Sequence, residues 1–94
     1  MSYDLAFLDA ALREWRTLDG AVREQFKKKL AERLVHPRVP KDRLHGGDGN
    51  RYKIKLRSVG YRLVYEVRDT EVIVLVIAVG RRDGADVYSQ AERR

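Results

Sequence analysis

Charged and apolar side chains alternate most regularly between Arg51 and Arg57. This period-two spacing predicts a strand whose apolar face carries Tyr52, Ile54 and Leu56. The opposite face is a row of cations: Arg51, Lys53, Lys55 and Arg57. Such a row is typical of a phosphate-binding surface, but it also occurs on exposed strands whose charges hinder edge-to-edge pairing. The alternation alone leaves both interpretations open.

Two further strands are predicted over residues 61–68 and 71–80, so that the three segments form a meander. Residues 72–79 are all apolar, which indicates a central strand covered on both faces. Alternation over residues 3–7 predicts a short first strand. With it, the sheet would have four strands and would be antiparallel.

Apolar residues recur at helical spacing in two segments between the first strand and the meander. The first segment contains Leu8, Ala11, Leu12, Trp15 and Leu18, and the second contains Val22, Phe26, Leu30 and Leu34. The intervening Asp19 and Gly20 predict that the two helices form a hairpin. The sparsely apolar segment 83–94 predicts a short, loosely held third helix. We therefore expect an α+β fold in one domain that spans residues 1–94.

The chain is basic, because twenty Lys and Arg against fourteen Asp and Glu give a formal net charge of +6 over 94 residues. A folded protein with this charge is expected to bind a polyanion. The absence of cysteine and the presence of two histidines argue against a disulfide, a metal or a cofactor. We find no secretion signal and no run that could span a membrane, which favours a cytoplasmic location. The run Lys27, Lys28 and Lys29 is interpreted as a solvated helix face or as an RNA contact.

Cleavage of RNA through its own 2′-hydroxyl requires a base, an acid for the departing 5′ oxygen and positive charge around the phosphate. The candidate groups are Lys53, Lys55, Arg62, Arg81, Arg82 and Tyr88. Crowded cations are expected to lower the pKa of the lysines and of Tyr88, whereas Asp83 and Asp86 would raise the pKa of the tyrosine. Arginine holds its proton tightly, so its expected role is to clamp phosphate oxygens.

Several blocks of the sequence resemble the RelE family of bacterial toxins from toxin–antitoxin systems. These blocks are residues 12–16, 22–30, 52–57, 60–65 and 79–89, and they cover nearly the whole chain in the right order. The resemblance implies an mRNA interferase that enters the ribosomal A site and cuts the codon displayed there. Such a reaction leaves a 2′,3′-cyclic phosphate and a 5′-hydroxyl.

The resemblance also implies roles for residues at matching positions. Tyr88 would be a leading candidate for the base, and Arg82 would lie at the leaving group. Lys53, Lys55 and Arg62 would hold the scissile phosphate, and whether a lysine or the tyrosine takes the proton stays open. Other residues would contact ribosomal RNA or mRNA: Lys27, Lys28, Lys29, Arg51, Arg57, Arg81 and, in a weaker or pH-dependent way, His45.

The resemblance further implies a partner, an acidic antitoxin whose helix displaces the C-terminal helix of the toxin. The toxin would be a monomer alone and part of a hetero-oligomer with its antitoxin. Two alternatives remain: a ParE-like toxin of the same fold that inhibits DNA gyrase, and a ribosome-binding protein that blocks translation without cutting RNA. The joint presence of the five candidate catalytic residues favours cleavage over gyrase inhibition.

Overall fold

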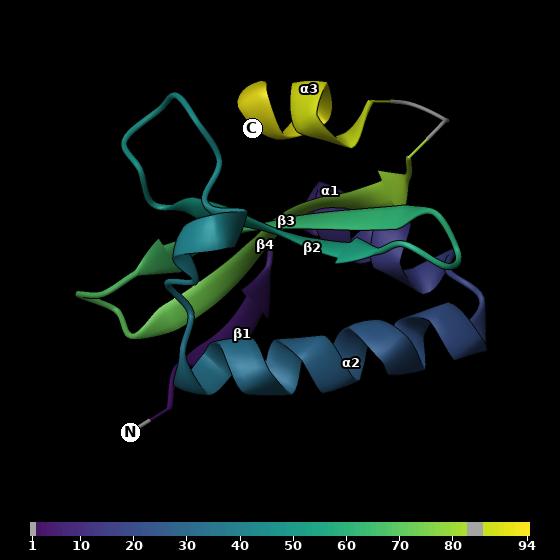
Figure 1. The fold of residues 1–94 in the computed structure, drawn as a ribbon, viewed down its shortest axis with the longest axis horizontal. Coiled ribbons are helices and arrows are strands. Elements are labelled where there is room, and N and C mark those ends of the chain that lie inside the picture. The colour runs from purple at the N-terminus through teal and green to yellow at the C-terminus, as the bar shows by residue number, and fades with distance from the viewer. Residues whose placement is uncertain (1, 83–85) are drawn as a thin grey trace.

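The computed structural model describes residues 2–82 and 86–94, and it places a mixed sheet between helices (Figure 1). The elements, in chain order, are β1 (Asp4–Phe7), α1 (Asp9–Arg16), α2 (Gly20–Val35), the short 3-10 helix η1 (Pro40–Asp42), β2 (Arg51–Leu56), β3 (Tyr61–Arg68), β4 (Ile73–Arg81) and α3 (Val87–Glu92). The predicted helical hairpin and three-stranded meander are confirmed. Within the predicted segment 83–94, residues 83–85 lie outside the described residues, and α3 forms in the remainder.

The sheet has the strand order β1-β4-β3-β2, and β1 pairs with β4 in parallel. The prediction of a purely antiparallel sheet is therefore wrong. The meander makes β4 run in the same direction as β2. The helical hairpin carries the chain back to the end of the sheet at which β1 began, so β2, and with it β4, runs parallel to β1. Side-chain alternation defines the faces of a strand but not its direction.

One face of the sheet packs against α1 and α2. Phe26 and Leu30 of α2 are 0% and 2% exposed, and both belong to a cluster that includes inward-facing residues of β2, β3 and β4. Aromatic contacts tie α1 into the same core, because the rings of Trp15 and Phe26 lie 6.2 Å apart and those of Phe7 and Trp15 lie 5.3 Å apart. This face forms the larger apolar core.

The opposite face is partly covered by α3, which lies across the sheet from α2 (Figure 1). Val87 and Ala91 of α3 belong to a second cluster with Val64, Leu75, Ile77 and Ala78. A register shift after Val64 leaves Ile77 without a pairing partner, so that Ile77 and Ala78 can both contribute to this cluster. The prediction that the third strand of the meander is covered on both faces is confirmed.

Candidate active site

A pocket of about 430 Å³ lies where β2 ends and β3 begins, beside the first turn of α3. It is lined by Lys55 and Arg57 at the end of β2, Arg62 of β3, Arg82 just after β4 and Tyr88 of α3. None of the described residues that line it is acidic, so the pocket concentrates positive charge. Cations converging in this way suit a phosphate group. The pocket unites four of the five predicted catalytic residues, and Lys53 is the exception.

Arg62 is buried at the base of this site, with 7% of its surface exposed. Its Nη1 donates a hydrogen bond to the carbonyl oxygen of Tyr61 at 2.9 Å. Lys55 is its direct partner in the β2–β3 register. Like charges directly opposite one another destabilise a strand pair. A bound anion would relieve that repulsion, so the arrangement favours binding of a negatively charged ligand.

The pKa of Lys55 is lowered, chiefly by the positive charge of Lys53. Partial desolvation and the charges of Arg57 and Arg62 act in the same direction, whereas Asp42 opposes them. The expected effect of crowded cations is thus confirmed for Lys55. Lys53 influences the site from the same face of β2 without lining the pocket.

The pKa of Tyr88 is raised, chiefly because the phenol is partly buried. Arg62 favours the ionised form of Tyr88, whereas Asp86 and Asp42 disfavour it. Arg62 thus acts in the expected direction, but the expected net lowering of the pKa of Tyr88 is wrong, because desolvation outweighs the effect of Arg62. Asp86 acts in the expected direction, and Asp83 lies outside the described residues.

Asp86 also fixes the start of α3. Its Oδ1 accepts a hydrogen bond from the backbone nitrogen of Tyr88 at 3.1 Å, and its Oδ2 accepts one from Ser89 Oγ at 2.9 Å. This N-cap holds the first turn of the helix, and therefore Tyr88, beside the pocket.

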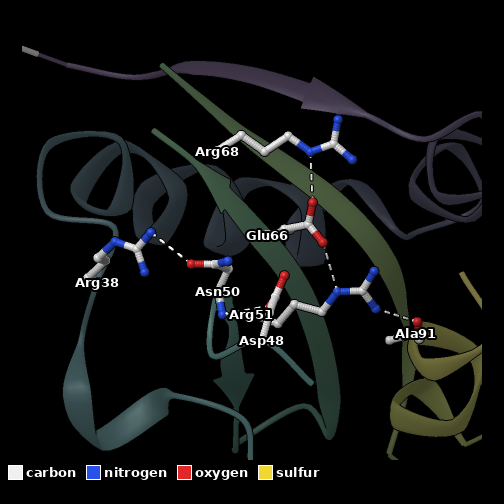
Figure 2. A network of polar contacts seen from close by, with 7 residues as sticks. All are labelled: Arg38, Asp48, Asn50, Arg51, Glu66, Arg68 and Ala91. Atoms are coloured by element: carbon white, nitrogen blue, oxygen red, sulfur yellow. Dashed lines mark hydrogen bonds and ion pairs between the residues drawn. The ribbon is translucent and has the colours of Figure 1, made fainter. Parts of the chain in front are cut away.

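Arg51, at the far end of the cationic row, has its charge matched by Glu66. Its Nε lies 3.1 Å from Glu66 Oε1, and its Nη1 donates to the carbonyl oxygen of Ala91 in α3 (Figure 2). Glu66 Oε2 also pairs with Arg68 at 2.7 Å. Arg51 therefore connects the sheet to the last turn of α3 and does not line the pocket.

The other predicted RNA contacts are dispersed. Arg57 lines the pocket, whereas the guanidinium carbon of Arg81 lies 5.7 Å from the ring centre of Tyr61. His45 borders a neighbouring cavity of about 600 Å³ between the loop at residues 44–48 and α3, and Tyr88 lines both this cavity and the pocket. The run at 27–29 is exposed on α2, on the other side of the sheet from α3.

Sequence reasoning missed a polar cluster made by Arg33 of α2, Asp42 of η1 and Tyr65 of β3. Arg33 Nη2 lies 2.6 Å from Asp42 Oδ2, and its Nη1 donates to the Tyr65 hydroxyl at 2.8 Å. The available signal was a cation between Leu30 and Leu34 on the apolar side of α2. Within residues 2–82 and 86–94, no three His, Asp or Glu side chains gather as a metal site, and no helix is long and apolar enough to cross a membrane.

The fold and site can be compared with those of known proteins. A family model described as the ParE toxin of the type II toxin–antitoxin system parDE matches residues 5–85. The mRNA interferase toxin RelE of Escherichia coli K12 is 54% identical over 94 residues, which are 100% of this chain and 98% of the relative.

Two solved structures of Escherichia coli proteins are also similar. The free state of a RelE mutant with two arginine-to-alanine changes gives a TM-score of 0.90 at 53% identity and covers 100% of this chain and 98% of that one. A chain of the intact RelBE toxin–antitoxin complex gives a TM-score of 0.83 at 53% identity, covering 88% of this chain and 100% of that one. The chain therefore belongs to the RelE and ParE family of toxins from type II toxin–antitoxin systems.

Proposed function

We propose that this protein is a toxin that inhibits translation by cutting mRNA in the ribosomal A site, with the RNA 2′-hydroxyl as the attacking group. The observation that carries the proposal is the pocket in which four cations and one phenol converge without a lining carboxylate among the described residues. Full-length similarity to an mRNA interferase supports the same activity.

In this mechanism the pocket stabilises the charge that develops on the phosphate. Arg62 holds the oxygens that do not take part in bond exchange, with Arg57 as a further contact, and Lys55 lies beside them in the pocket. A base removes the 2′-hydroxyl proton, the 2′ oxygen forms a bond to phosphorus, and the bond to the 5′ oxygen breaks. We assign Arg82 to stabilise the negative charge on the departing 5′ oxygen, which takes up a proton from solvent and leaves as a hydroxyl.

The directions of the pKa shifts support Lys55 over Tyr88 as the base. A lowered pKa brings more of the neutral amine of Lys55 into the working range of pH, whereas a raised pKa keeps Tyr88 protonated. Protonated Tyr88 retains a hydroxyl that can donate a hydrogen bond to the phosphate. Lys53 assists by lowering the pKa of Lys55.

Ribosome binding is assigned to cations outside the pocket. Lys27, Lys28 and Lys29 are exposed on α2, and Lys27 also pairs with Glu24 at 3.3 Å. Their exposure allows contact with ribosomal RNA while the opposite face holds mRNA. The ribosome then supplies the substrate geometry, which a small surface pocket cannot impose on free RNA. We place this activity in the cytoplasm, where ribosomes and mRNA are found.

An acidic antitoxin is the proposed protein partner. The net charge of +6 favours an acidic protein, and solved structures of relatives include a toxin–antitoxin complex. Displacement of α3 would expose the apolar residues beneath Val87 and Ala91 to a replacing helix. Alone, the toxin is a monomer in this proposal.

Mapping of mRNA ends on programmed ribosomes tests the proposal. We expect new ends at the A-site codon with the wild type and none with Arg82→Ala. Intact mRNA with blocked translation would instead support inhibition by occupancy, and loss of supercoiling activity in purified gyrase would support the gyrase alternative.

A further inference from the structure

The strand that carries Lys53 and Lys55 is an edge strand. In the order β1-β4-β3-β2 of the described strands, β2 pairs with β3 on one side and with no other strand on its other side. Backbone groups on the free side of an edge strand need other partners to define its position. A strand that slips or frays would displace Lys55 from the pocket and move Lys53 away from Lys55.

Among the described residues, two hydrogen bonds hold the free side of β2, one of them within an isolated bridge between Arg43 and Tyr52. The backbone nitrogen of Leu44 donates to the carbonyl oxygen of Arg51 at 2.9 Å, and Arg33 Nη1 donates to the carbonyl oxygen of Lys53 at 3.2 Å. The second contact reaches β2 from a different layer, because Arg33 belongs to α2. It acts on the backbone of Lys53, two residues before Lys55.

The guanidinium of Arg33 is itself fixed in place. Its side chain is 12% exposed, it pairs with Asp42 of η1, and its guanidinium carbon lies 5.7 Å from the ring centre of Tyr65. The fully buried Tyr65 donates its hydroxyl proton to the carbonyl oxygen of Pro37 at 2.6 Å. A partly buried ion pair adds little net stability, so stability alone does not account for this cluster.

Asp42 also connects the cluster electrostatically to the pocket. Its carboxylate raises the pKa of both Lys55 and Tyr88. The charges that face Lys55 are otherwise positive, from Lys53, Arg57 and Arg62. Arg33 engages Asp42 at 2.6 Å and offsets its negative charge. Loss of Arg33 would therefore both release the strand and leave the Asp42 carboxylate unpaired beside the catalytic groups.

We infer that Arg33 is a positioning residue for the reaction: through its contacts with Lys53 and Asp42 it fixes the edge strand that carries the catalytic lysines. The inference rests on the proposed RNA cleavage. The inference gives α2 two roles: its exposed cations contact the ribosome, and its buried side positions the edge strand.

Single-turnover cleavage on programmed ribosomes, measured across pH beside a separate ribosome-binding assay, tests this role. For Arg33→Met we expect cleavage to slow by about 10- to 100-fold with ribosome affinity unchanged, because displaced catalytic groups reduce rate without removing surface contacts. The unpaired Asp42 should raise the pKa of Lys55, so the rise of rate with pH should move to higher pH. Wild-type rate and pH profile in Arg33→Met would overturn the inference.

Three further variants separate positioning from charge and from folding. Arg33→Met with Asp42→Asn should restore the pH profile while cleavage stays slow, and a restored rate would contradict the contact with β2. Arg33→Lys keeps the charge but loses the forked guanidinium, so it should cleave slowly with the wild-type pH profile. A wild-type rate would contradict the inference even if Arg33→Met fails to fold.

Glu32→Met, on the exposed side of the same helix, is the control and should behave as the wild type. A wild type that cuts no mRNA would refute the proposed function and not the contact described here.

Discussion

The two faces of the sheet are built differently. The face under α1 and α2 is apolar and closed by aromatic contacts, with Phe26 and Tyr65 fully buried. The face under α3 combines a small apolar cluster with two opposed cations, Lys55 and Arg62. None of the described residues that line the pocket is a carboxylate that could relieve their repulsion. The first face provides stability, and the second sacrifices some stability for the proposed phosphate site.

The largest effect is expected on the apolar face. Phe26→Ala should lower the free energy of unfolding by about 3–5 kcal/mol, because it removes a fully buried ring and leaves a cavity. Urea denaturation measures this change. A loss below about 1 kcal/mol would mean that this face is not the main source of stability.

The second effect concerns the cationic face. Arg62→Met should slow single-turnover cleavage by roughly 100- to 1000-fold, since one preorganised charge at the phosphate is lost. The free energy of unfolding should stay the same or increase, because the repulsion with Lys55 disappears. Destabilisation comparable to that of Phe26→Ala would contradict the division between the faces.

A third effect tests the coupling of the two lysines. Lys53→Ala should reduce cleavage by roughly 10- to 100-fold at neutral pH, less than Arg62→Met. Lys53 is the main cause of the lowered pKa of Lys55, so its removal should raise that pKa and move the rise of rate with pH to higher pH. An unchanged pH profile would argue against Lys55 as the base.

A smaller effect is expected where α3 meets the sheet. A Cβ added at Gly80 would lie 3.2 Å from Val87 Cγ2, so Gly80→Ala should weaken the docking of α3 by about 1 kcal/mol. Hydrogen exchange of the α3 amides would then become faster. Gly20→Ala is the matched control on the other face, because its added Cβ meets nothing closer than 3.9 Å. Equal exchange in both variants would show that α3 tolerates the added methyl group.

The smallest effect is expected from single cations on α2. Lys28→Ala should weaken ribosome binding slightly and reduce the slope of log affinity against log salt by about 0.7–0.9, as expected for one phosphate contact. The rate of cleavage by bound toxin should not change. A loss of cleavage without a loss of affinity would show that Lys28 acts in the cleavage step and not in ribosome binding.

Much of this division could be predicted from sequence, because it depends on alternation. Period-two spacing placed Lys53 and Lys55 on one face of β2, and the neighbouring strand brought Arg62 beside them. The parallel direction of β1 could not be predicted in the same way, because a side-chain pattern is identical in both directions.

Other features depend on contacts that spacing does not reveal. The pairing of Arg51 with Glu66 follows from the exact strand register, and that of Arg33 with Asp42 follows from the path of the loop after α2. The raised pKa of Tyr88 depends on how deeply α3 buries its phenol. To predict any of these features, one must know how one element of the fold is positioned relative to another.

The chemical identity of the RNA ends tests the central claim most directly. Mass spectrometry of mRNA recovered from programmed ribosomes should find a 2′,3′-cyclic phosphate on the upstream fragment and a 5′-hydroxyl on the downstream fragment, because the 2′-hydroxyl is the attacking group. Uncut mRNA, or a 5′-phosphate that indicates attack by water, would contradict the account.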